Sequence, residues 1–164
     1  SEHIIGKIYG RPDLFAWIFG GMGLVMSLTT LLNSRLSSKF GARKTLRGLL
    51  ISYTVTGSFM LITTLVLGDP PSMTLFFAAI VVMMSINLAI EPNSSSLALE
   101  PMGDMAGIAA SVYGTLFFSI GSTLGSIISH YMVDGVFPLV IGFFAAGVIG
   151  LLLMSGDKRE YPKK

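Results

Sequence analysis

The sequence predicts an all-α membrane protein, a polytopic bundle of five transmembrane helices, and three observations support this. Five apolar runs each hold about 19 to 27 residues, and a helix needs roughly 20 to cross a bilayer core. Charged residues make up 12% of the chain, about half their share in soluble domains. Alternate crossing would place nine of the eleven Lys and Arg on one side. The runs are residues 14–34, 48–67, 73–99, 106–129 and 136–154.

The distribution of basic residues predicts an orientation. Short loops rich in Lys and Arg stay in the cytoplasm, so the fragment should begin outside and end inside, in the plasma (inner) membrane of the cell. We expect an outer loop at 1–13, a membrane part at 14–155 and a cytoplasmic tail at 156–164. Lys7 and Arg11 fall on the outer side. The nine inner residues are Arg35, Lys39, Arg43, Lys44, Arg47, Lys158, Arg159, Lys163 and Lys164.

Composition argues against several functions. The chain has no Cys, which excludes disulfides and thiolate chemistry, and its two His are isolated, so we expect neither a metal site nor a cofactor. No hydrolase, P-loop or zinc-protease motif is present, and we do not expect an enzyme. The basic residues flank membrane runs without interleaved aromatic residues, which argues against nucleic-acid binding. The chain starts at Ser1 without a signal-peptide pattern, so we expect a piece of a longer protein.

The first run has a small-residue side, which indicates a helix inside a bundle. Pro12 and Asp13 mark its start, and Trp17 suits an aromatic belt at the outer interface. At 100° per residue, six small residues share an arc of about 80°. Small residues let helix backbones approach closely in lipid. They are Ala16, Gly20, Gly23, Ser27, Thr30 and Ser34.

A basic turn is expected at 33–47, with Gly41 at its centre where a tight turn would use positive φ. The second run carries Ser52, Thr56 and Thr63. The sequence Gly-Asp-Pro-Pro-Ser at 68–72 predicts a short outer loop between the second and third runs.

The third run becomes polar at membrane depth and contains the candidate substrate-binding residues Asn87, Glu91 and Asn93. Asn87 and Glu91 share a helical face, and Pro92 is expected to kink the helix. An ionised Glu91 within lipid is costly, so it could line a wet cavity, carry protons, or pair with Arg35 or Arg43 near the inner surface. The two Asn residues could line a cavity or tie helices together.

The fourth run has the clearest division into two faces. We expect Gly114, Gly121 and Gly125 to form its helix-packing side, although such a side could also contact substrate. The fifth run is bulky, with Pro138 in its first turn and a weaker small stripe. The ten Met residues suit gap filling in an apolar interior, or a promiscuous binding surface.

Residues 91–111, which read EPNSSSLALEPMGDMAGIAAS, resemble the region of the tenth and eleventh helices in major facilitator superfamily transporters. They are most similar to the Bcr/CflA-type drug:proton antiporters. The basic turn resembles the family's cytoplasmic loop motif at Arg35, Lys39, Gly41, Arg43 and Lys44. Ser38 is the nearest match to an acidic residue of that motif, so a charge lock is not expected here.

The resemblance implies that the five runs are helices eight to twelve of a twelve-helix transporter, with the N-terminal helices as their missing partners. It implies multidrug efflux by alternating access, with a small-molecule substrate, protons as the coupling ion and the lipid bilayer as surroundings. Two alternatives remain. One is a major facilitator carrier that takes up a metabolite, and the other is a stand-alone five-span scaffold protein.

Overall fold

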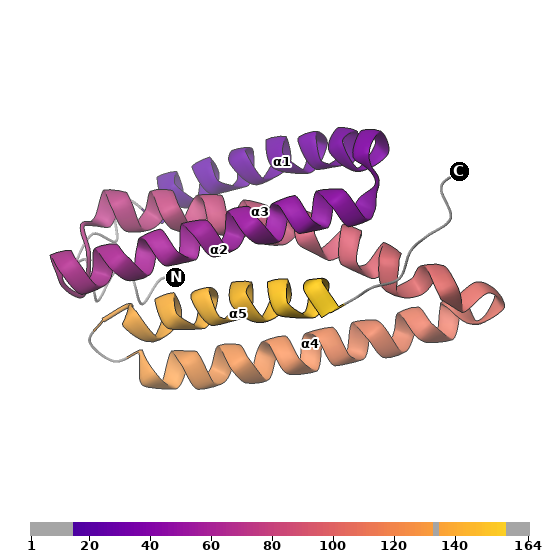
Figure 1. The fold of residues 1–164 in the computed structure, drawn as a ribbon. Helices are drawn as coiled ribbons and strands as arrows, with labels where there is room; N and C mark the ends of the chain where they lie inside the picture. The colour runs from indigo at the N-terminus through magenta and orange to yellow at the C-terminus, as the bar shows by residue number, and fades with distance from the viewer. Residues whose placement is uncertain (1–14, 133–134, 157–164) are drawn as a thin grey trace.

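The computed structural model describes residues 15–132 and 135–156, and helices account for almost all of them (Figure 1). The predicted outer loop at 1–13 and residues 157–164 of the predicted tail lie outside the described residues. The elements are α1 (Phe15–Phe40), α2 (Ala42–Leu67), α3 (Met73–Leu99), the 3-10 helix η3 (Glu100–Met105), α4 (Ala106–Tyr131) and α5 (Phe137–Gly156).

The prediction of five separate membrane helices needs a correction. Four helical stretches among the described residues are long and apolar enough to cross a membrane. The third extends from Met73 to Tyr131 with a kink at Gly103, because residues 100–105 between the third and fourth runs form 3-10 turns. The chain still reverses within this stretch, at Gly103, where φ is 46° and ψ is −120°. Helices α3 and α4 therefore lie as two arms of a hairpin (Figure 1). The four stretches are Ala16–Phe40, Ala42–Leu67, Met73–Tyr131 and Phe137–Gly156.

The basic turn is also shorter than expected. Residues 33–40 continue α1 and residues 42–47 already belong to α2, so the helices meet at Gly41 alone. Arg, Lys and Leu are good helix formers, which explains why the helices extend beyond the apolar run. Gly41 has φ 82° and confirms the expected positive φ. The turn and the α3–α4 hairpin lie at the same end of the bundle, which we call the basic end (Figure 1).

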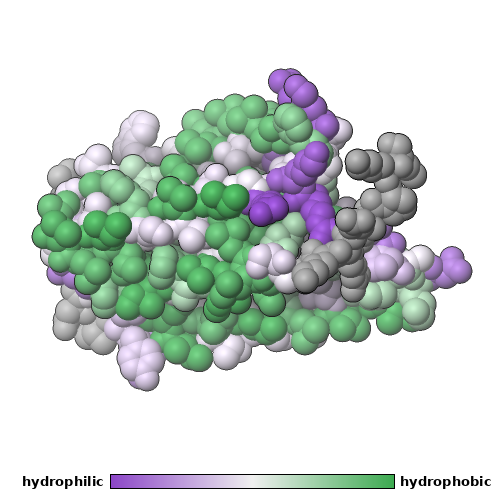
Figure 2. Space-filling view, viewed as in Figure 1, coloured by the Kyte–Doolittle hydropathy of each residue, from purple (hydrophilic) through white to green (hydrophobic). Residues whose placement is uncertain are grey.

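Helices α2, α3 and α5 enclose the core, while α1 packs on α2 and α3, and α4 lies along α5 at the edge (Figure 1). The most deeply buried large side chains come from these three helices and the residue before α5: Met60, Phe76, Met83, Val136 and Val140. The outward surfaces are apolar, as Figure 2 shows for one face, and hydrophilic residues gather toward the basic end. This distribution suits a bundle surrounded by lipid.

Close packing between α2 and α5 depends on two glycines. A Cβ atom added at Gly57 would lie 3.3 Å from the Phe144 Cα, and one at Gly147 would lie 3.1 Å from the Thr54 Cα. These backbone neighbours cannot move aside without separating the helices. Small residues thus create the α2–α5 contact, as expected where lipid supplies no hydrophobic drive between helices.

Asp69 connects the two loops at the opposite end of the bundle. Its carboxylate accepts hydrogen bonds from the Val136 N–H, at 2.8 Å, and from the Phe137 N–H, at 3.3 Å. These N–H groups stand at the start of α5, where a helix has no internal acceptors for them. A negative charge there also complements the helix dipole. The α2–α3 loop therefore caps α5 across a sequence separation of 67 residues.

We expect Gly147→Leu to lower the free energy of unfolding by about 1–3 kcal/mol, because the side chain would force α5 away from the α2 backbone. Thermal unfolding of the purified protein in detergent measures this. Gly21→Leu is the matched control, since a Cβ there meets nothing within 4 Å. Equal midpoints for the two variants would contradict the close α2–α5 contact.

Candidate functional site

The predicted polar residues occupy the half of α3 nearer the basic end, but they do not form one cluster. Asn87 is exposed and Glu91, one turn later, is half-buried. Asn93 follows Glu91 by two residues, about 200° around the helix, and is buried with 2% exposure. Helix α3 is continuous through Pro92. The structure therefore places Asn87 and Glu91 on one side of α3 and Asn93 on the other.

Asn93 joins α3 to α1. Its amide nitrogen donates to the Asn33 Oδ1 at 2.8 Å and to the Ala89 carbonyl oxygen of its own helix at 2.7 Å. Asn33 is also buried, with 7% exposure. Asn93 thus links two helices in this structure, and its role as a substrate-binding residue stays a prediction. The sequence analysis did not predict a role for Asn33, because it placed this residue at the start of a turn. A second Asn close to the same membrane surface as Asn93 could have indicated a hydrogen bond between the two.

A second polar contact joins α3 to α4. The hydroxyls of Ser94 and Tyr113 lie 3.2 Å apart, and the Ser94 hydroxyl also donates to the Glu91 carbonyl oxygen at 2.9 Å. Tyr113 stacks on Phe117 with ring centroids 6.1 Å apart. The polar stretch after Glu91 thus reaches two of the neighbours of α3: α1 through Asn93 and α4 through Ser94.

Glu91 forms no salt bridge with another residue that the structure describes, so neither Arg35 nor Arg43 neutralises it here. Its role as a cavity residue, an ion-pair partner or a proton carrier stays a prediction.

The basic residues of the predicted loop motif lie on both sides of Gly41. Arg35 and Lys39 lie near the C-terminal end of α1, and Arg43 and Lys44 lie in the first turn of α2. The Lys39 ammonium lies 5.3 Å from the centroid of the Phe40 ring. Within residues 15–132 and 135–156, no three His, Cys, Asp or Glu are grouped as a metal site would need.

Two of the cavities between the helices reach α3, and neither is lined by Asn87, Glu91 or Asn93. One, of about 570 Å³, lies near the basic end between α2, α3 and α5, with Ser94 in its wall. The other, of about 490 Å³, lies between α1, α3 and α5 and is strongly apolar. We call it the Met/Phe cavity. Four Met and four Phe line it: Met22, Met26, Met84, Met132, Phe19, Phe76, Phe77 and Phe143.

The small-residue face of α4 has no neighbour among the described residues. A Cβ added at Gly114, Gly121 or Gly125 would meet nothing within 4 Å. The opposite side of α4 is also largely exposed, with Ile120 at 58% and Leu124 at 54%. The packing role of these glycines therefore stays a prediction, and any partner for this face lies beyond the described residues.

A bundle of long apolar helices with polar side chains inside one of them is the architecture of a multi-pass membrane protein. Comparison with known proteins identifies its kind. Residues 2–161 match the family model of the Major Facilitator Superfamily, and the chain belongs to this family. The expected family resemblance is thereby confirmed.

Two curated relatives refine the comparison. The chain is 31% identical over 147 residues to the bicyclomycin resistance protein homolog of Haemophilus influenzae, covering 88% of this chain and 36% of that protein. It is 27% identical over 161 residues to YdgK of Bacillus subtilis, described as an uncharacterized MFS-type transporter, covering 98% of this chain and 39% of that protein. The chain thus spans well under half the length of either relative. No solved structure matches it significantly.

We expect Asn93→Ala to lower the free energy of unfolding by about 0.5–2 kcal/mol, because it leaves the side-chain oxygen Oδ1 of Asn33 buried without its donor. Unfolding in detergent measures the change. Asn87→Ala is the matched control, since Asn87 is exposed on the same helix.

A double-mutant cycle with Asn33→Ala isolates the contact itself. We expect the two substitutions to cost less together than the sum of their separate effects. Additive effects would contradict a direct interaction between Asn33 and Asn93.

Proposed function

We propose that this chain is part of the C-terminal half of a secondary active transporter that exports drugs or similar small molecules by proton-coupled alternating access. In this proposal its five α-helices cross the membrane as helices eight to twelve of the complete protein. The observation that carries it is the similarity to a bicyclomycin resistance protein homolog over 88% of the chain, within the major facilitator family. A carrier, rather than an enzyme, is the function that this family supports.

The Met/Phe cavity supports a substrate with a large apolar surface. Its volume of about 490 Å³ falls in the range of small-molecule sites. Methionine side chains adapt to differently shaped ligands, and aromatic rings supply large contact areas. Such a lining favours amphipathic compounds over sugars or small acids, which need convergent polar groups. The same cavity therefore argues against the uptake of a polar metabolite.

Asn87 and Glu91 are proposed to face the transport pathway. Both remain accessible on α3, and Glu91 has no salt-bridge partner among residues 15–132 and 135–156. An acidic side chain at membrane depth generally lines a wet cavity or pairs with a cation. Asn93, held by Asn33, would act indirectly by fixing the rotation of α3 and so the direction of the face that carries Glu91.

The basic end of the bundle is proposed to lie in the cytoplasm, because short basic turns stay inside. The small-residue faces of α1 and α4 would then pack against helices of the complete protein that this chain does not contain. A stand-alone five-span scaffold would need another role for these faces, since nothing lies within 4 Å of a Cβ placed at Gly20, Gly23, Gly121 or Gly125.

The direct test is transport by the complete natural protein in sealed vesicles. We expect an imposed proton gradient to drive several unrelated amphipathic compounds across the membrane in the export direction, and collapse of the gradient to abolish the movement. Gradient-driven movement of a polar metabolite in the opposite direction would indicate an uptake carrier. Absence of transport for every compound, in a correctly folded protein, would support the scaffold.

Glu91→Gln removes a charge from the proposed pathway while keeping the size of the side chain. We expect the transport rate of at least one cationic substrate, or its pH dependence, to change on the order of tenfold, about 1.4 kcal/mol in barrier height. The same vesicle assay measures this. Glu100→Gln is the matched control, because Glu100 is exposed in η3. Unchanged transport of all compounds by the Glu91 variant would remove Glu91 from the pathway.

A further inference from the structure

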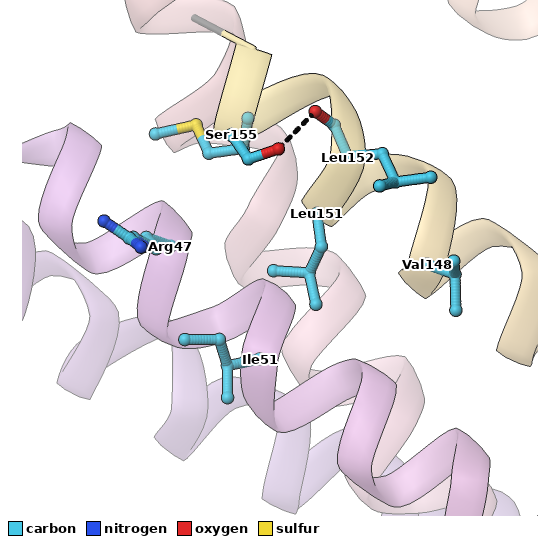
Figure 3. Close-up of a pocket in the computed structure, with 7 residues that line it drawn as sticks. Arg47, Ile51, Val148, Leu151, Leu152 and Ser155 are labelled. Carbon is cyan, nitrogen blue, oxygen red and sulfur yellow. Dashed lines mark hydrogen bonds between the residues drawn. The ribbon is translucent and has the colours of Figure 1, made fainter. Parts of the chain in front are cut away.

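A groove runs between α2 and α5 at the basic end (Figure 3). Its volume is about 370 Å³. Helix α2 contributes Arg47 and Ile51 to its walls, and α5 contributes Val148, Leu151, Leu152, Met154 and Ser155. Met154 borders both this groove and the cavity of about 570 Å³. The groove shares no lining residue with the Met/Phe cavity, so a ligand could occupy it without entering the proposed transport site.

The groove has polar and apolar parts in a definite order. Arg47 is the sixth residue of α2 and stands near the basic end, while Ile51 lies one turn deeper. On α5, Ser155 is next to the last residue of the helix, and Leu151 and Val148 lie progressively deeper. The charge is therefore at the rim near the membrane surface, and the aliphatic walls extend toward the membrane interior. A phospholipid has the same order of headgroup and acyl chains.

The charge of the groove selects among phospholipids. Among the described residues that line it, Arg47 is the one that carries a charge, and none has a carboxylate that could pair with a choline or ethanolamine headgroup. A guanidinium binds phosphate oxygens in a bidentate manner. The Ser155 hydroxyl already donates to the Leu152 carbonyl oxygen at 2.8 Å, which leaves Arg47 as the anion-binding group. Lys44, in the first turn of α2, adds positive charge at the same end of the bundle.

We propose that the α2–α5 groove binds an anionic phospholipid, with Arg47 on the phosphate and an acyl chain along Ile51, Leu151 and Leu152. A soluble anion would gain nothing from the aliphatic walls, and a zwitterionic lipid would leave its cation without a partner. The bound lipid would lie between the ends of α2 and α5 and so hold these two helices together at the basic end.

Native mass spectrometry of the complete protein, with phosphatidylglycerol and phosphatidylcholine of identical acyl chains, tests this. We expect retained phosphatidylglycerol to exceed phosphatidylcholine about fivefold, the factor that one basic residue near an anionic headgroup contributes. Arg47→Gln should abolish the preference. Its exposure makes the fold tolerant of the change, and the unfolding midpoint without added lipid checks this.

Two further variants separate a specific site from general attraction. Lys39→Gln removes one charge at the same end, outside the groove, and should keep the preference. Leu152→Trp, at a side chain that is 65% exposed, should fill the groove and reduce retention of phosphatidylglycerol. The proposal is overturned if Arg47→Gln keeps the preference, if Lys39→Gln loses it equally, or if wild type retains phosphatidylcholine as well as phosphatidylglycerol.

Discussion

The satisfaction of backbone hydrogen bonds in a medium without water is the constraint on which the rest of this structure depends. Each peptide group within lipid needs a partner in the chain, and a helix provides it locally. The described chain is accordingly helical except at short breaks. Glycine supplies the positive φ at three of them, Gly41, Gly68 and Gly103. Where α5 begins, the carboxylate of Asp69 accepts from N–H groups that the helix cannot satisfy itself.

The same medium explains how the helices are held together. Moving an apolar side chain from lipid into a helix interface gains little free energy. Close packing of the backbones and polar contacts therefore decide which helices pair. Gly57 and Gly147 allow α2 and α5 to touch, Asn33 and Asn93 join α1 to α3, and Ser94 and Tyr113 join α3 to α4. The proposed transport function uses what this arrangement leaves accessible: the face of α3 with Glu91, and the Met/Phe cavity.

Much of the fold could be predicted from the sequence because membrane spans are local features. The end of the second run at residue 67, the start of the third at residue 73, and the breaks at Gly41 and 68–72 follow from apolar length and from glycine or proline. The length of the basic turn and the conformation of the α3–α4 connection could not be predicted. In both places helical or 3-10 geometry continues through polar residues, so a polar segment does not mark the end of a helix. The Asn33–Asn93 contact spans 60 residues, and sequence alone does not show which helices are neighbours. The row of small residues on α4 is visible in the sequence. The glycines at the α2–α5 interface, Gly57 and Gly147, are not part of such a row and so could not be recognised as packing residues.

The proposed topology, on which the proposed function depends, has the polypeptide cross lipid five times, with the α1–α2 turn and the end of α5 on one side. Single cysteines at Ser38, Ser72 and Ser155 test it in a chain that has no other cysteine, by labelling intact cells with a thiol reagent that does not cross membranes. Labelling at Ser72 alone, with Ser38 and Ser155 reacting only after the cells are opened, is the expected result. Reaction of Ser38 and Ser155 from opposite sides would contradict the account.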